Sequence, residues 1–250
     1  MAKQRSVFLA LALGVVAALA LTSCGGGKKG SEAELPGGKP TIAAKAASAA
    51  TAPRPTATLP PRTPTAGPPA PIPADWTRHT VGKFQIGVPA DWVATPVSPE
   101  LIDALIEKMG STNPQFAPYL RALKQQKAVK FCALEPLSDP TFVPNVLVGQ
   151  ESQIMALDDY LEVVKKQLQP LGATVKVGEQ FTLRGDQAVR LEVRVKASLP
   201  NGESILAEEQ MIVVDHAGNR YAITMTYLPE DAQKYTELFD SVVQTFTFVE

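Results

Sequence analysis

The chain has 250 residues, and its 24 lysines and arginines nearly balance its 25 aspartates and glutamates. The charges are unevenly distributed along the chain. Residues 25–74 carry six basic and two acidic residues, whereas residues 75–250 carry 16 basic and 23 acidic ones. An acidic body argues against nucleic acid as a partner, since it offers no basic stripe to displace phosphate counterions. Two histidines and two cysteines also exclude many common catalytic and zinc sites.

Residues 1–23 have the anatomy of a secretory signal peptide. A basic start and an apolar run over residues 7–21 precede Leu21-Thr22-Ser23-Cys24, which has the pattern of a lipobox. The run has 15 residues, and a membrane-spanning helix needs roughly 20. The segment resembles bacterial lipoprotein signal peptides, which implies that Cys24 is the lipid-attachment residue and the mature N-terminus. An uncleaved membrane helix and an ordinary cleaved signal are the alternatives.

Residues 24–74 comprise the lipidated cysteine and a linker that is predicted to be disordered. Glycine, alanine, proline, threonine and serine dominate it, and its few bulky apolar residues stand alone. Such a stretch cannot offset the entropy cost of ordering. We therefore expect a tether that holds the folded part near the cell membrane, on the extracytoplasmic face.

Residues 75–250 are predicted to form one globular domain in which helices interrupt strands. Phe84, Ile86 and Val88 alternate with polar or small residues, which indicates a half-buried strand. Ser98-Pro99-Glu100 is typical of a helix start, with an N-cap, a proline and an acidic residue in the first turn. A second helical stretch is expected after Asn113-Pro114.

Two further strands, at residues 129–134 and 146–151, are predicted to precede a helix near residues 158–168. Asp158 and Asp159 fit an N-cap and a first-turn acid better than a metal site, because adjacent residues point in different directions on a helix. Cys132 lies in the first of these strands and is interpreted as a small buried hydrophobic residue, not as a nucleophile.

The clearest strand signal covers residues 188–197, where aliphatic residues alternate with charged ones. A period of two with charges outward predicts one solvated face. Returning strands are expected at residues 205–214 and 220–227, which makes an antiparallel meander. A helix that starts at Pro229 and a short strand at residues 246–248 complete the chain.

Four of these features together resemble the PsbP-like superfamily over most of residues 78–250. They are the Phe84–Trp92 segment, the Asp158–Leu161 helix start, the meander, and the Phe239–Phe246 ending. The resemblance implies an α+β fold in which helices flank an antiparallel sheet as an α/β/α sandwich. It also implies a docking module with no shared catalytic constellation, so no functional residue is carried over. The helical stretch around residues 111–127 departs from the usual pattern of the family.

No catalytic, cofactor or metal motif is present in the sequence. It has no nucleophile elbow, no phosphate-binding glycine loop and no histidine or cysteine cluster at metal spacing. Arg184-Gly185-Asp186 is interpreted as a hairpin turn. Glu208 and Glu209 alternate across a strand, so they cannot act on one ligand as a pair. We therefore predict neither a cofactor nor a metal, and no enzyme activity.

These observations favour a membrane-anchored extracytoplasmic lipoprotein that acts as a non-catalytic protein-interaction module. The expected partner is an envelope or membrane protein. Two alternatives remain open at this point. One is a carrier for a small apolar ligand held between the sheet and a helix layer. The other is an enzyme that uses carboxylates such as Asp186 or Glu192, although neither has a visible partner in the sequence.

Overall fold

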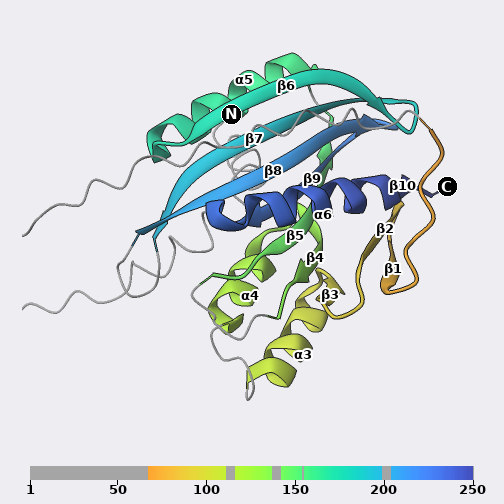
Figure 1. The fold of residues 1–250 in the computed structure, drawn as a ribbon, viewed down its shortest axis with the longest axis vertical. Helices are drawn as coiled ribbons and strands as arrows, with labels where there is room; N and C mark the ends of the chain where they lie inside the picture. Colours follow the sequence, from red (N-terminus) through yellow and green to blue (C-terminus); the bar gives the residue numbers. More distant parts are fainter. Residues whose placement is uncertain (1–66, 111–115, 137–141, 154, 199–203, 250) are drawn as a thin grey trace, which may run out of the picture. The chain divides into compact units, whose positions relative to one another are not determined.

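The computed structural model describes residues 67–110, 116–136, 142–153, 155–198 and 204–249. These residues form a large antiparallel sheet with helices on both faces, and a small sheet packs beside it (Figure 1). The α+β class and the α/β/α arrangement predicted from the sequence are therefore confirmed.

The large sheet has the strand order β3-β4-β5-β9-β8-β7-β6, and every neighbouring pair is antiparallel. Its strands are β3 Val93–Pro96, β4 Val129–Leu134, β5 Asn145–Ser152, β6 Thr174–Leu183, β7 Asp186–Ser198, β8 Ser204–His216 and β9 Asn219–Tyr227. The small sheet has the order β1-β2-β10, and its strands are β1 Trp76–Val81, β2 Phe84–Pro89 and β10 Thr247–Phe248. The predicted meander corresponds to β7, β8 and β9.

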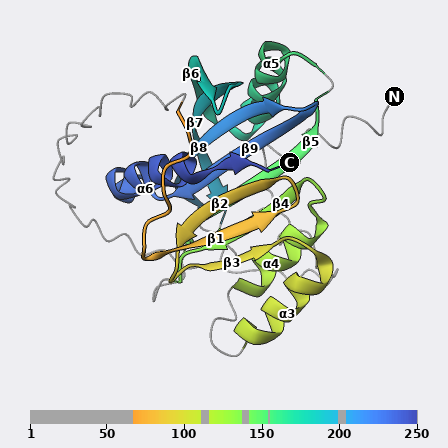
Figure 2. The same ribbon diagram turned by 90° about the vertical axis from the view of Figure 1, so that its right-hand side faces the viewer.

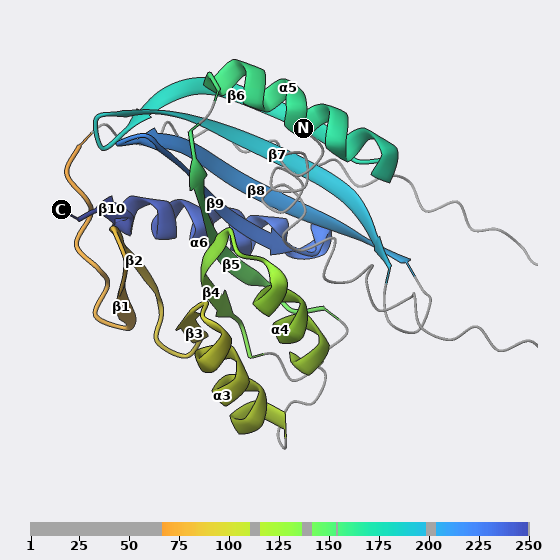
Figure 3. The ribbon, with the colours of Figure 1, turned by 180° about the vertical axis from the view of Figure 1, so that it is seen from behind.

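The helices divide between the two faces of the large sheet. They are α3 Pro99–Gly110, α4 Phe116–Gln125, α5 Leu157–Leu168 and α6 Ala232–Thr245, with short 3-10 helices η2 Gln169–Leu171 and η3 Pro229–Asp231. We call the face that packs against α6 and the small sheet the front face, and the opposite one the back face (Figure 2). The back face packs against α5 at one side and against α3 and α4 at the other (Figure 3).

Strand alternation assigns each side chain of the meander to a face. Val189 and Leu191 of β7 join the apolar cluster under α5, as do their register partners Val213 and Met211 of β8. Residues of even number therefore lie on the front face of β7 and β8. Glu208 consequently faces front and Glu209 faces back, as the sequence predicts.

Helix starts confirm one predicted cap and correct another. The Leu101 amide donates to Ser98 Oγ at 3.3 Å, so Ser98 caps α3. In α5, by contrast, the N-cap is Ala156, and Asp158 lies in the first turn. The prediction of Asp158 as N-cap was wrong, because its carboxylate instead accepts a hydrogen bond from Gln180 Nε2 at 2.6 Å.

The end of α6 is joined to the small sheet through a glycine. The Gly87 amide donates to Thr245 Oγ1 at 2.8 Å, and a Cβ at position 87 would lie only 3.1 Å from that oxygen. The close approach of β2 to the last turn of α6 therefore requires a residue without a side chain at this position.

The first described residues are fastened by Arg184. This residue lies in the turn between β6 and β7, with φ of 55°, so the predicted hairpin turn is confirmed. Its guanidinium donates to the carbonyl of Gly67 at 2.6 Å and to that of Pro68 at 3.2 Å. It also donates to the carbonyls of Gln244 and Phe246, at the end of α6. One side chain thus ties the incoming chain to the last turn of α6.

Candidate interaction surface

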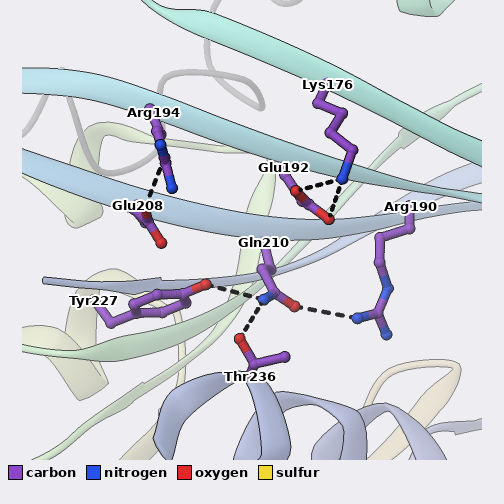
Figure 4. Close-up of polar contacts among 8 residues, drawn as sticks. All are labelled: Lys176, Arg190, Glu192, Arg194, Glu208, Gln210, Tyr227 and Thr236. Atoms are coloured by element: carbon purple, nitrogen blue, oxygen red, sulfur yellow. Dashed lines mark hydrogen bonds and ion pairs between the residues drawn. The ribbon is translucent and has the colours of Figure 1, made fainter. Parts of the chain in front are cut away.

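A band of polar side chains crosses the front face of the meander beside α6, with Gln210 at its centre (Figure 4). The Gln210 side chain is buried, and its Nε2 donates to Tyr227 Oη at 2.9 Å and to Thr236 Oγ1 at 2.6 Å. Its Oε1 accepts a hydrogen bond from Arg190 Nη1 at 3.2 Å. Both donors and the acceptor of one amide are therefore used to join β7, β8, β9 and α6.

Arg190 is covered by α6 and does not lie on a solvated face. Its side chain is 19% exposed, forms an ion pair with Asp240 of α6, and lies 5.8 Å from the centre of the Phe239 ring. The prediction of one solvated face along β7 therefore fails at this position. The physical reason is that a partner carboxylate 50 residues away allows α6 to cover a charged residue.

Farther along the same strands, the side chains of Lys176, Glu192 and Arg194 are open to solvent, whereas that of Glu208 is mostly buried. Arg194 Nε lies 2.7 Å from Glu208 Oε1, and the arginine is 57% exposed while the glutamate is 12% exposed. Lys176 Nζ lies 3.1 Å from Glu192 Oε2. The Lys176–Glu192 pair is exposed on both sides, and such pairs contribute only about 0–1 kcal/mol to stability, so it can exchange partners at small cost.

An exposed leucine completes this area. Leu206 is 46% exposed and is the register partner of Lys196, which places both on the front face near the end of the β7–β8 hairpin. Lys196 is exposed and has no ion pair among the described residues. We call this area the front polar surface; its residues are Lys176, Glu192, Arg194, Lys196, Leu206 and Glu208.

A second polar contact borders the front polar surface at the start of α6. Lys234 Nζ lies 2.8 Å from Glu135 Oε1, and the Tyr235 hydroxyl donates to the same carboxylate. The Tyr235 ring stacks on Tyr227 with centroids 5.6 Å apart. Tyr227 therefore links this contact to the Gln210 network.

The two carboxylates considered for catalysis both have partners that the sequence did not reveal. Asp186 Oδ2 lies 2.8 Å from Nδ1 of His216, whose ring stacks on Phe248 at a centroid distance of 3.7 Å. Glu192 pairs with Lys176. Both contacts join residues of neighbouring strands that are far apart in the sequence, so the sequence alone did not show them.

Cys132 is fully buried, as the sequence predicts, and burial raises the pKa of its thiol far above the usual range. A thiol that stays protonated is a poor nucleophile.

Among the described residues, no group of three His, Cys, Asp or Glu side chains is placed to hold a metal ion. In the same part of the chain, no helix is both long enough and apolar enough to cross a membrane. The predicted leader (residues 1–23) and Cys24 lie outside the described residues.

Neither a family model nor a curated protein sequence matches the chain. Solved structures with a similar fold include cyanobacterial PsbP from Synechocystis sp. PCC 6803, with 13% identity over 70% of this chain and 93% of that one, at a TM-score of 0.46. LpqN of Mycobacterium tuberculosis, described as involved in cell envelope biogenesis, shares 15% identity over 67% and 83% of the chains, at a TM-score of 0.41. A Ran-binding protein of Saccharomyces cerevisiae shares 10% identity over 68% and 92%, at 0.39. All three TM-scores lie below 0.5, so these similarities carry no argument about the function of this chain.

Proposed function

We propose that the protein is an extracytoplasmic lipoprotein whose folded part docks to a protein partner without catalysing a reaction. The observation that supports this function best is the front polar surface, which α6 leaves open although it covers the adjoining Arg190. The leader pattern that ends at Cys24 supports the anchored location.

The exposure of the charges indicates the chemistry of the partner. The basic groups of Lys176 and Arg194 extend farther into solvent than the carboxylates that pair with them. Lys196 adds an unpaired positive charge among the described residues, next to the apolar Leu206. We therefore propose a partner with an acidic patch around an apolar contact, since complementary charges steer association and fix register.

The position of the surface also favours a protein partner. Arg184 holds the chain that leads back toward Cys24 at one end of β7. The strand has 13 residues, and at 3.3 Å per residue its other end lies roughly 40 Å away. Lys196 and Leu206 of the front polar surface thus lie near the end of β7 that is remote from Gly67, the first described residue.

A crosslinking experiment in the native host tests the docking. A photoreactive amino acid at Leu206 of the full-length protein is expected to give one crosslinked protein. Mass spectrometry identifies this protein and the crosslinked residue, which should lie beside acidic residues. Combining Arg194→Glu with Lys196→Glu should lower the yield about tenfold, which corresponds to about 1.4 kcal/mol. The same crosslinker at Leu171, another exposed apolar residue on η2, is the matched control and should not give this product.

Three outcomes contradict the docking proposal. They are no protein crosslink at Leu206, an equal yield of the same product from Leu171, and an unchanged yield after charge reversal. A Leu206 crosslink to lipid alone would instead show that the surface contacts the membrane.

The anchor has a separate test. Cys24→Ser removes the only sulfur at the lipobox, so the variant is expected to lose the mass of the acyl groups and to leave the membrane fraction. Fractionation followed by intact-mass measurement checks both effects, with Cys132→Ser as the control that keeps Cys24. Membrane association of Cys24→Ser equal to that of the control would contradict lipid anchoring.

A further inference from the structure

A row of hydrogen-bonding side chains lies on the back face, on the other side of the sheet from the front polar surface. Glu209 of β8 is the register partner of Thr226 of β9, which is in turn the partner of Asn145 of β5. All three are buried, with 5%, 1% and 1% of their surfaces exposed. Adjacent residues in such a row have Cβ atoms about 5 Å apart, so their polar atoms can meet one ligand.

Two oxygens of this row, one on Asn145 and one on Thr226, have no hydrogen-bond partner within the described residues. Asn145 Nδ2 donates to the Val143 carbonyl at 2.9 Å, but its buried Oδ1 accepts no hydrogen bond. Thr226 Oγ1 is also buried and makes no well-formed hydrogen bond, although it lies close to the Glu209 carboxyl. A buried polar atom without a partner costs about 1–3 kcal/mol, which favours a ligand that completes the set.

A fourth oxygen reaches the row from a helix. Tyr119 of α4 has a buried hydroxyl that also makes no well-formed hydrogen bond, and it lies near both Cys132 and Glu209. Apolar residues flank the row on the same face. They include Val193 and Met211 under α5, and Leu147 beside α4.

Glu209 gives the row its chemical character. Glu208, the preceding residue, is paired with Arg194, whereas Glu209 forms no ion pair with any described lysine or arginine. Burial raises the pKa of Glu209 to about 8. A glutamine could supply similar hydrogen bonds, but only a carboxyl group can lose its proton and become a carboxylate that pairs with a positive charge.

We propose that Glu209, Thr226, Asn145 and Tyr119 form a binding site for the ammonium group of a small organic amine. The four side chains together offer mainly acceptor oxygens, and a primary ammonium carries three N–H donors. The flanking aliphatic side chains suit an apolar body attached to that group. This ligand class differs from the purely apolar ligand that the sequence left open, and the site is independent of the docking surface.

Binding of the ammonium should release a proton at neutral pH. The unliganded Glu209 is protonated at pH 7, and it transfers its proton to solvent when the ammonium takes its place beside the carboxylate. The other titratable groups near Glu209 are Tyr119, Cys132 and Tyr160, from α4, β4 and α5. Burial raises the pKa of each, so they stay neutral and Glu209 alone exchanges a proton.

Calorimetry on the full-length protein in neutral detergent tests this site with hexylamine, hexanol and hexanoate as probes. Hexylamine is expected to bind at least ten times more tightly than the other two. About one proton should be released per amine bound at pH 7, measured in two buffers of different ionisation enthalpy. Glu209→Gln should weaken hexylamine binding at least tenfold and abolish the proton release.

Glu208→Gln is the matched control, because it changes the same group one residue away on the opposite face, and it should bind hexylamine as the parent does. Thr226→Val keeps the shape of its side chain and should weaken binding severalfold. Circular dichroism verifies that each variant is folded. Hexanol binding as tight as hexylamine, equal loss in Glu208→Gln, or no hexylamine binding to the parent would overturn the proposal.

Discussion

Replacing Arg220 by alanine is expected to lower the free energy of unfolding by about 3–5 kcal/mol. Arg220 is 1% exposed and holds the buried Asp215 through two hydrogen bonds, Nε to Oδ1 at 2.6 Å and Nη2 to Oδ2 at 2.7 Å. Its guanidinium also donates to the Met155 carbonyl at 3.0 Å and lies 4.4 Å from the centre of the Tyr160 ring. The substitution leaves a buried carboxylate without its cation and loosens the segment that leads into α5.

Urea unfolding of the variant measures this effect. Removing both partners, with Arg220→Ala and Asp215→Ala together, should cost less than the sum of the single changes, because no charge is then left unpaired. Lys165→Ala is the control, since it breaks an exposed pair with Glu162 and should change stability by at most about 0.5 kcal/mol. A loss below about 1 kcal/mol in Arg220→Ala would contradict the importance of this buried pair.

Phe239→Ala is the second change with a large expected effect, about 3–5 kcal/mol. The side chain is fully buried in the front cluster between α6 and the sheet, and it lies beneath Arg190. Truncation leaves a cavity that the surrounding core can fill only in part. Because α6 also carries Thr236 and Asp240, the variant should loosen the Gln210 network as well.

Thermal or urea unfolding measures the loss, and Glu237→Ala, which changes an exposed residue of the same helix, should stay within about 0.5 kcal/mol of the parent. The crosslink at Leu206 gives an independent readout of the front polar surface in Phe239→Ala. Equal stability of the two variants would mean that α6 is not fixed to the sheet by this ring.

Local patterns predicted most of the elements correctly. The alternation in β2 and β7, the proline at the start of α3 and the meander all follow from periodicity and caps that need only near neighbours in sequence. The opposite directions of Glu208 and Glu209 follow from the period of a strand. In contrast, β1, β3 and β6 were not identified. The register of β6 shifts between Val177 and Gln180, which interrupts its alternation.

The polar contacts on both faces of the sheet depend on residues far apart in the sequence, which no local pattern reveals. The covering of Arg190 depends on Asp240, and the pairing of Asp186 depends on His216. The row on the back face joins residues of β5, β8 and β9 that are separated by up to 81 positions. Only the strand order of the sheet makes them neighbours. The sequence analysis therefore singled out Glu209 but not Thr226 or Asn145.

The grip of Arg184 on both the incoming chain and the end of α6 has a mechanical consequence. A pull on the chain at Gly67 would pass through this side chain, and through the Ala70 amide that donates to the Gln244 carbonyl, to the last turn of α6. The β7–β8 hairpin extends roughly 40 Å from that turn, so its far end carries none of the pull directly. Such a pull would therefore reach the C-terminal end of α6 before it reached the far ends of β7 and β8.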